Sequence, residues 1–136
     1  MKNFLLLFTL CCLNCAAQQP YKQSDLVADL SASQMLNYAT SPTSLKKLQG
    51  NITIIDFFGT WCAPCIKALP ELKSYQEKFK DDVKVILVSI ETKEKLSKFI
   101  NSRQPFAFPM IVDADNIFTN ALIRHPIPIQ LCWIKI

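Results

Sequence analysis

The chain lacks several patterns that would point to other classes of protein. Its 15 Lys and Arg residues are scattered among 11 Asp and Glu residues, for a net charge of +4. No basic block follows a nucleic-acid backbone, so we expect no nucleic-acid partner. No internal repeat or low-complexity tract is present, and 136 residues leave room for one domain and a targeting segment.

The sequence also lacks an apolar run long enough for a stable membrane anchor. The N-terminal run, Phe4 to Leu13, is shorter than the roughly 20 residues that a spanning helix needs. It follows Met1-Lys2-Asn3 and precedes the small residues Cys15-Ala16-Ala17, as in a cleaved signal peptide. We therefore expect an exported protein of the periplasm or cell envelope. The alternative is a lipoprotein anchored through Cys15, although the residues before it fit a lipobox poorly.

Cysteine is scarce beyond the N-terminal signal-like segment. We interpret residues 1–17 as the signal peptide, 18–34 as a linker or N-terminal arm, and 35–136 as the folded domain. Cleavage then leaves Cys62, Cys65 and Cys132. One pair plus one odd cysteine is not the disulfide framework of a small secreted domain, so we expect a functional pair and a buried bystander.

The pair lies in Cys62-Ala63-Pro64-Cys65, between the apolar run Ile52 to Phe58 and the helical pattern Ile66 to Phe79. A C-x-x-C at a strand–helix junction is typical of a thioredoxin-like redox site. The first sulfur lies beyond the helix N-terminus, where unpaired N–H groups and the macrodipole favour a thiolate. The second thiol can then displace the product from a mixed disulfide.

The rest of the chain alternates strand and helix patterns. An interior Pro70 predicts a kink in the helix that follows the cysteines, and Ser44 and Thr92 are candidate N-caps. The alternation predicts an α/β domain with a mixed, mostly parallel central sheet flanked by helices. Further strands are expected at Met35–Tyr38, Val83–Ile90, Met110–Val112 and Ile127–Ile136, and further helices at Ser44–Leu48, around Leu96–Ile100, and at Ile117–Ile123.

Asp56 is the second candidate site residue, since it interrupts an apolar strand six residues before Cys62. Burial of an acid is costly and raises its pKa. A carboxyl group beneath the cysteine pair can pass a proton to or from the resolving thiol, Cys65. The alternative is an exposed acid at the end of the strand.

The stretch from Asp56 to Cys65, followed by Leu69-Pro70, resembles the active-site block of the thioredoxin superfamily. Gly59-Thr60-Trp61 and Leu69-Pro70-Glu71 are most similar to the exported branch of TlpA and ResA. The resemblance implies a thioredoxin-like fold, and a thiol-disulfide oxidoreductase that needs no cofactor beyond its Cys62–Cys65 disulfide. It also implies that Cys62 is the nucleophile and Cys65 the resolving thiol.

The same resemblance implies a substrate-binding surface around the pair. Trp61 would be a surface aromatic beside the site. Pro128 would be the cis-proline that faces the disulfide, with Ile127 offering backbone groups to the substrate chain, and Pro126 competes for this role. The loop residues Ala63 and Pro64 resemble those of reductases. We therefore expect a monomeric reductant of exported protein disulfides that is recharged by a membrane thiol reductant.

Two departures from the family pattern concern the C-terminal part. The family usually carries Thr after the cis-proline, whereas this chain has Ile129. Family members also continue into a further strand and a closing helix. Because this chain stops at Ile136, we expect a domain that lacks these elements and leaves a sheet edge uncovered.

Three other functions remain as alternatives. Cys62, Cys65 and His125 are a conceivable copper or zinc set. A peroxidase on the same fold is another, although Thr60 stands at the wrong spacing from Cys62 for the peroxidase motif. A non-catalytic remnant of the fold is the third. Covalent c-type haem is excluded at this pair, because Ile66 rather than His follows Cys65.

Overall fold

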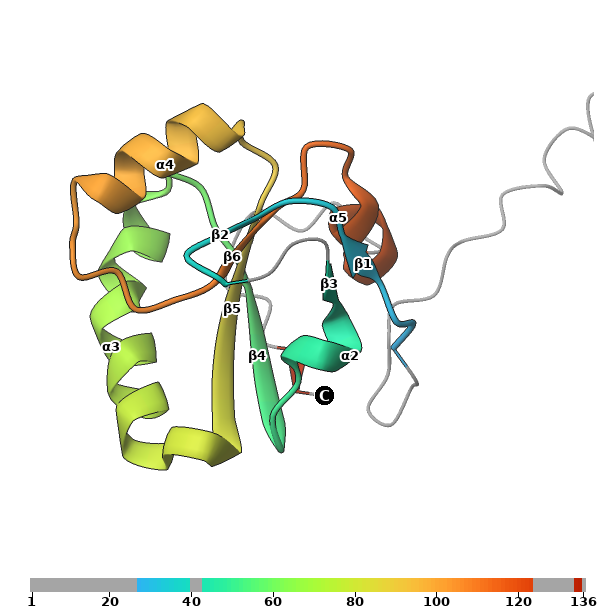
Figure 1. The fold of residues 1–136 in the computed structure, drawn as a ribbon. Helices are drawn as coiled ribbons and strands as arrows, with labels where there is room; N and C mark the ends of the chain where they lie inside the picture. The colour runs from blue at the N-terminus through green and yellow to red at the C-terminus, as the bar shows by residue number, and fades with distance from the viewer. Residues whose placement is uncertain (1–26, 40–42, 124–133, 136) are drawn as a thin grey trace, which may run out of the picture.

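The computed structural model describes residues 27–39, 43–123 and 134–135, which form an α/β arrangement (Figure 1). No helix in these ranges is long and apolar enough to cross a membrane. In chain order the elements are β1 (Ser31–Ala32), β2 (Met35–Leu36), β3 (Thr43–Ser44), α2 (Leu45–Leu48), β4 (Ile52–Phe57), α3 (Ala63–Phe79), η2 (Lys80–Asp82), β5 (Val83–Ser89), α4 (Lys93–Asn101), β6 (Met110–Val112), α5 (Ile117–Leu122) and β7 (Ile134–Lys135).

Five strands form the central sheet in the order β2-β6-β5-β4-β7. The three inner strands are parallel, whereas β2 pairs antiparallel with β6 and β7 pairs antiparallel with β4. β4 and β5 are rich in apolar β-branched residues, as expected of strands covered on both faces. The prediction of a mixed, mostly parallel sheet flanked by helices is confirmed.

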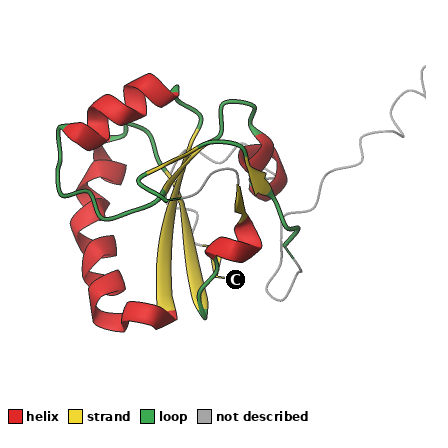
Figure 2. Cartoon of the chain, in the orientation of Figure 1, coloured by secondary structure: helices red, strands yellow, loops and turns green. Residues whose placement is uncertain are grey.

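Helices cover both faces of this sheet. α3 and α4, which connect the parallel strands, lie on one face, and α2 and α5 lie on the other (Figure 1 and Figure 2). Side chains alternate along β4, so Ile54 and Phe58 belong to one core cluster and Ile55 to the other. Cys62 and Cys65 belong to the cluster of Phe58, which places the cysteine pair on the face that α3 and α4 cover.

The predicted helices are present, but two of them are capped differently than expected. Ser44 and Thr92 occupy the N-cap positions of α2 and α4 without a side-chain cap hydrogen bond. At α2, the backbone N–H of Lys46 instead donates to Oδ1 of Asp29 at 2.9 Å. A carboxylate from the preceding arm therefore replaces the serine hydroxyl as the acceptor at this helix end. Pro70 lies inside α3, and the kink at this residue stays a prediction.

Packing begins before Met35, the predicted first residue of the domain. β1 pairs antiparallel with β3, and Ala32 is buried in the core cluster on the α2 and α5 face. Val27 and Leu30 pack against the same cluster. The arm is mostly polar in sequence, so these few apolar contacts are not apparent from its composition. Each of them removes a side chain from water.

The predicted C-terminal strand is described only in part. β7 pairs with β4 through Ile54–Lys135 and Ile55–Ile134. Ile127, Pro128 and the competing Pro126 lie outside the described residues, as do His125 and Cys132. The expected signal peptide also lies outside them. The expectation that a final strand and helix are lacking stays a prediction.

Candidate active site

The cysteine pair forms a disulfide at the start of α3. Sγ of Cys62 and Sγ of Cys65 are 2.02 Å apart, and the two Cα atoms are 5.2 Å apart. Cys62 is the N-cap residue of α3, and the backbone N–H of Cys65 donates to Sγ of Cys62 at 3.3 Å. This N–H is one of the donors that a helix N-terminus leaves without an intrahelical partner. The first sulfur therefore lies where the motif predicts it, at the positive end of the helix.

The surface beside the disulfide is formed by Trp61, Ala63 and Pro64. Cys62 and Cys65 are only 4% and 5% exposed, whereas Trp61 is 60% exposed. Ala63 and Pro64, in the first turn of α3, are exposed as well. The indole of Trp61 lies over Gly59, because a Cβ atom at Gly59 would be 2.9 Å from its Cε2 atom. A larger residue at this position would displace the ring, so Gly59 leaves room for the exposed aromatic to lie against the backbone.

Asp56 is buried on the same face of the sheet as the cysteine pair. Asp56 lies two positions before Phe58, which directly follows β4, so the two side chains lie on the same face. Phe58 shares a core cluster with both cysteines. Sγ of Cys65 lies 3.9 Å from the carbonyl oxygen of Phe57, directly beyond Asp56 in the chain. The alternative of an exposed acid is wrong, because Asp56 is 4% exposed.

The environment of Asp56 shifts its proton affinity. Oδ2 of Asp56 is buried and has no hydrogen-bond partner among the described residues. Burial disfavours the charged form and raises the pKa of Asp56 from 3.8 to about 6. The carboxyl group therefore changes its protonation state near neutral pH, as general acid–base chemistry requires.

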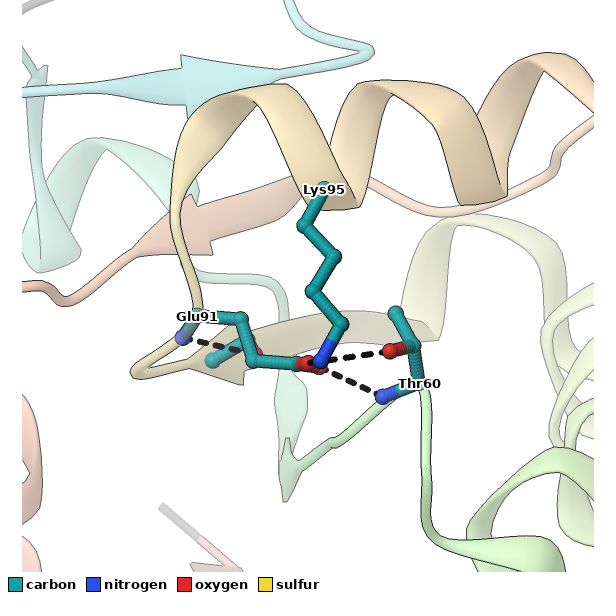
Figure 3. Close-up of polar contacts among 4 residues, drawn as sticks. Thr60, Glu91 and Lys95 are labelled. Atoms are coloured by element: carbon teal, nitrogen blue, oxygen red, sulfur yellow. Dashed lines mark hydrogen bonds and ion pairs between the residues drawn. The ribbon is translucent and has the colours of Figure 1, made fainter.

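A second acidic residue, Glu91, holds the loop that leads to Cys62, and it was not among the residues predicted for the site. Its carboxylate accepts hydrogen bonds from the backbone N–H of Thr60 and, at 2.9 Å, from Oγ1 of Thr60. Lys95 reaches down from α4 and forms an ion pair with the same carboxylate (Figure 3). The backbone N–H of Glu91 donates to Oγ of Ser89 at 3.3 Å. Glu91 thus connects the end of β5 and the start of α4 to the active-site loop.

The Glu91 side chain is only 8% exposed, yet it is held as an anion. Desolvation alone would raise the pKa of Glu91. The hydrogen bonds from Lys95 and Thr60, together with the positive charge of Lys95, outweigh this effect and hold the pKa below its usual value. One signal in the sequence pointed to Glu91: it follows a buried strand that neighbours β4, and the carboxyl ends of such strands form sites in open α/β sheets.

The described residues do not test the alternative of a copper or zinc site. No group of three or more His, Cys, Asp and Glu side chains in the described ranges is arranged to hold a metal ion. His125, which the alternative requires, lies outside those ranges.

The fold and the disulfide at the start of α3 together define a thioredoxin-like redoxin domain. The chain belongs to the AhpC/TSA family, whose sequence model matches residues 24–123. Thiol-disulfide oxidoreductase ResA of Bacillus subtilis (strain 168) is 31% identical over 86 residues, which are 62% of this chain and 48% of that protein. Thioredoxin-like protein YneN of the same strain is 27% identical over 78 residues, which are 55% of this chain and 46% of that protein.

Solved structures give the same fold. A secreted thiol-disulfide isomerase from Corynebacterium glutamicum has a TM-score of 0.68 at 16% identity, over 91% of this chain and 78% of that one. At this identity the likeness shows the fold alone. The chain spans about half the length of the curated relatives described above. The resemblance that the motif indicated, to thioredoxin-like proteins of the ResA type, is confirmed.

Proposed function

We propose that the protein is a thiol-disulfide oxidoreductase that reduces disulfides of exported proteins by dithiol exchange. The observation that carries this proposal is the Cys62–Cys65 disulfide at the start of α3, with the Cys65 N–H on the sulfur of Cys62. The name of the ResA relative supports the same class of reaction. The structure corresponds to the oxidised form, and the reduced dithiol is the form that acts on substrate.

The exchange proceeds in two balanced steps. In the reduced protein the Cys62 thiolate attacks a substrate disulfide, forms a mixed disulfide and expels one substrate sulfur as a thiolate. Cys65 then loses its proton and attacks the sulfur of Cys62, which expels the second substrate sulfur. The substrate gains two electrons from the cysteine pair, and its two thiolates take up one proton released by Cys65 and one from solvent. The protein returns to its disulfide form.

Asp56 is proposed to accept the proton that Cys65 loses in the second step. A carboxyl group with a pKa of about 6 is mostly ionised at pH 7 and still basic enough to take up a proton transiently. Its burial on the α3 face keeps competing water away. No other carboxylate of the described residues combines this position with a raised pKa.

The substrate is proposed to approach across Trp61, Ala63 and Pro64. These side chains are exposed while the sulfurs are nearly covered, so a partner has to come close to the loop to reach Cys62. Ile127 and Pro128, outside the described residues, are proposed to supply the opposite side of this surface through backbone contacts.

The protein is proposed to act as a reductant rather than as an oxidant. Ala63 and Pro64 bring no cation beside Cys62, and without one the reduced form is not stabilised strongly enough for an oxidising potential. An upstream membrane thiol reductant would recharge an exported monomer of this kind. A reduction potential near about −120 mV, the value of a strong periplasmic oxidant, would contradict the proposed direction.

Reduction of insulin disulfides by the purified, chemically reduced chain tests the function, with Cys62→Ser as the matched control. We expect reduction by the wild type and none by Cys62→Ser. Lack of reduction by the wild type would favour the non-catalytic remnant. Consumption of hydrogen peroxide without insulin reduction would favour the peroxidase, and stoichiometric zinc or copper in the purified protein would favour the metal module.

A further inference from the structure

A groove runs between α3 and the segment that connects α4 to β6. Ile66, Leu69 and Pro70 line it from α3, and residues 105–108 line it from the connecting segment. In Figure 1 this segment leaves α4 and crosses α3 before it enters β6. The groove has a volume of about 310 Å³, within the range of small binding sites. Its floor and walls are mainly apolar, and it has no role in the exchange chemistry described above.

The connecting wall of the groove is held in place by several contacts. Nδ2 of Asn37 donates to the carbonyl oxygens of Phe106 and Phe108, each at 2.9 Å. The ring of Phe106 packs edge-to-face against Phe99 and Phe108, with centroids 6.1 and 5.8 Å away. Such aromatic pairs add to the stability of the packing beyond the area they bury. The wall is therefore part of the packed domain.

The wall packs on the same core cluster as the cysteine pair. Phe99 packs on Phe58, with ring centroids 5.0 Å apart, and Phe58 belongs to the core cluster of Cys62 and Cys65. On the α3 side, Ile66 directly follows Cys65 in the first turns of the helix. The α3 end of the groove therefore begins one residue beyond the disulfide in the chain.

Two cationic side chains stand at the groove, and none of its described lining residues is acidic. The guanidinium of Arg103 lies 4.0 Å from the centre of the Phe99 ring, and it also donates to Oγ of Ser102. A stacked guanidinium keeps further N–H donors at its edge for a carboxylate. Nζ of Lys73 is 3.6 Å from Oε1 of Glu77, and both side chains are exposed, so this pair is weak.

We propose that this groove binds an apolar segment of the protein disulfide substrate, with an acidic residue of that segment at Lys73 and Arg103. The proposal rests on the proposed oxidoreductase function and adds a substrate class to it: disulfides followed by apolar and acidic residues. The apolar side chains fill the space between α3 and Phe106, and the carboxylates meet the two cations. Charge at the rim of an interface chiefly changes the association rate and the choice of partner.

The test uses the full chain in its reduced form and two synthetic peptides. The peptides share one internal disulfide followed by Leu-Leu, and they then continue with Glu-Glu in one and Lys-Lys in the other. We expect the acidic peptide to be reduced in a single turnover with a second-order rate constant roughly fivefold higher than that of the basic peptide, as two partly exposed ion pairs allow. The preference should reverse in K73E/R103E and persist in K46E/K47E, which carries the same charge change on α2, on the other face of the sheet.

Each other outcome overturns the proposal in a distinct way. Equal rates for the two peptides in the wild type, or a preference that survives K73E/R103E, would show that the groove does not select the substrate. Because Arg103 also packs on Phe99, the single variant K73E repeats the test with an exposed residue. Self-association in sedimentation velocity that K73E abolishes would assign the groove to a second copy. Reduction of hydroxyethyl disulfide by the wild type shows separately that the proposed function holds.

Discussion

Asp56 and Glu91 are two acidic residues near the carboxyl ends of neighbouring parallel strands, and their surroundings differ. Asp56 is buried with an oxygen that has no partner among the described residues, and its pKa is raised to about 6. Glu91 is also nearly covered, but it accepts hydrogen bonds from Thr60 and pairs with Lys95, and its pKa is lowered. The comparison shows that partners, not burial alone, decide whether a carboxylate can exchange a proton or serves as a fixed anchor.

The largest expected effect is on the rate at which the mixed disulfide is resolved, and it concerns Asp56. Asp56→Asn removes the group proposed to take the proton of Cys65, so resolution of the mixed disulfide should slow about a hundredfold at pH 7. Stopped-flow release of the second substrate thiol measures this step. In the wild type its rate should rise as the pH rises through about 6, and in Asp56→Asn this rise should be absent. An unchanged second step in Asp56→Asn would remove Asp56 from the mechanism.

The same two residues should affect stability with opposite signs. The folded state holds the proton of Asp56 up to about pH 6, against 3.8 for an ordinary carboxyl, so its contribution to stability falls as the pH rises between these values. Relative to wild type, Asp56→Asn should therefore gain about 3 kcal/mol of unfolding free energy between pH 3.8 and 7. Urea unfolding of the oxidised protein across this range measures the difference.

Glu91→Gln should show the opposite pH dependence of unfolding free energy in the same urea experiments. Since the folded pKa of Glu91 is lowered from 4.5, the stability from its charge is present above this value and is lost as the pH falls. Parallel pH curves for Asp56→Asn and Glu91→Gln, relative to the wild type, would contradict the comparison.

A smaller effect, on the free energy of unfolding, is expected when the Glu91 carboxylate is removed. Glu91→Ala leaves the backbone N–H of Thr60 without its acceptor and should cost about 2 kcal/mol of unfolding free energy, the scale of a hydrogen bond to a charged group. Glu91→Gln keeps an acceptor oxygen and should cost about half as much. Chemical unfolding at pH 7 checks both values. Equal losses for the two variants would mean that the charge of Glu91, not its acceptor, stabilises the loop.

The smallest effect concerns the hydroxyl of Thr60. Thr60→Val keeps the shape of the side chain but removes the 2.9 Å hydrogen bond to Glu91, which should cost about 1 kcal/mol. Thr60→Ser keeps the hydroxyl and is the matched control. A Thr60→Val variant as stable as the wild type would show that this hydroxyl adds nothing to the stability of the loop.

The residues around the cysteines were largely predictable because their signals are local. An apolar run, a C-x-x-C and a helical pattern occupy consecutive positions from Ile52 to Phe79, and the structure shows β4, the disulfide and α3 there. Asp56 was found for the same reason, since an acid within an apolar strand stands out in the sequence. Its burial then followed from the pattern of its neighbours.

Contacts between distant segments were not predictable in the same way. Glu91 meets Thr60 across 31 positions, and Asp29 replaces Ser44 as the acceptor at α2 across 17 positions. Each depends on how parallel strands and the arm come together, and polar residues at such positions look like ordinary loop residues. The groove wall is a further case, since Asn37 reaches Phe106 only after β2 pairs with β6.

The most direct test of the account is the pH dependence of Cys62 alkylation by iodoacetamide in the reduced chain, with Cys65→Ser to isolate the first sulfur. We expect a thiol pKa below the ordinary value of about 8.5, because Cys62 lies at the N-terminus of α3 and accepts the N–H of residue 65. An alkylation rate that rises only near about pH 8.5, as for an unperturbed thiol, would contradict it.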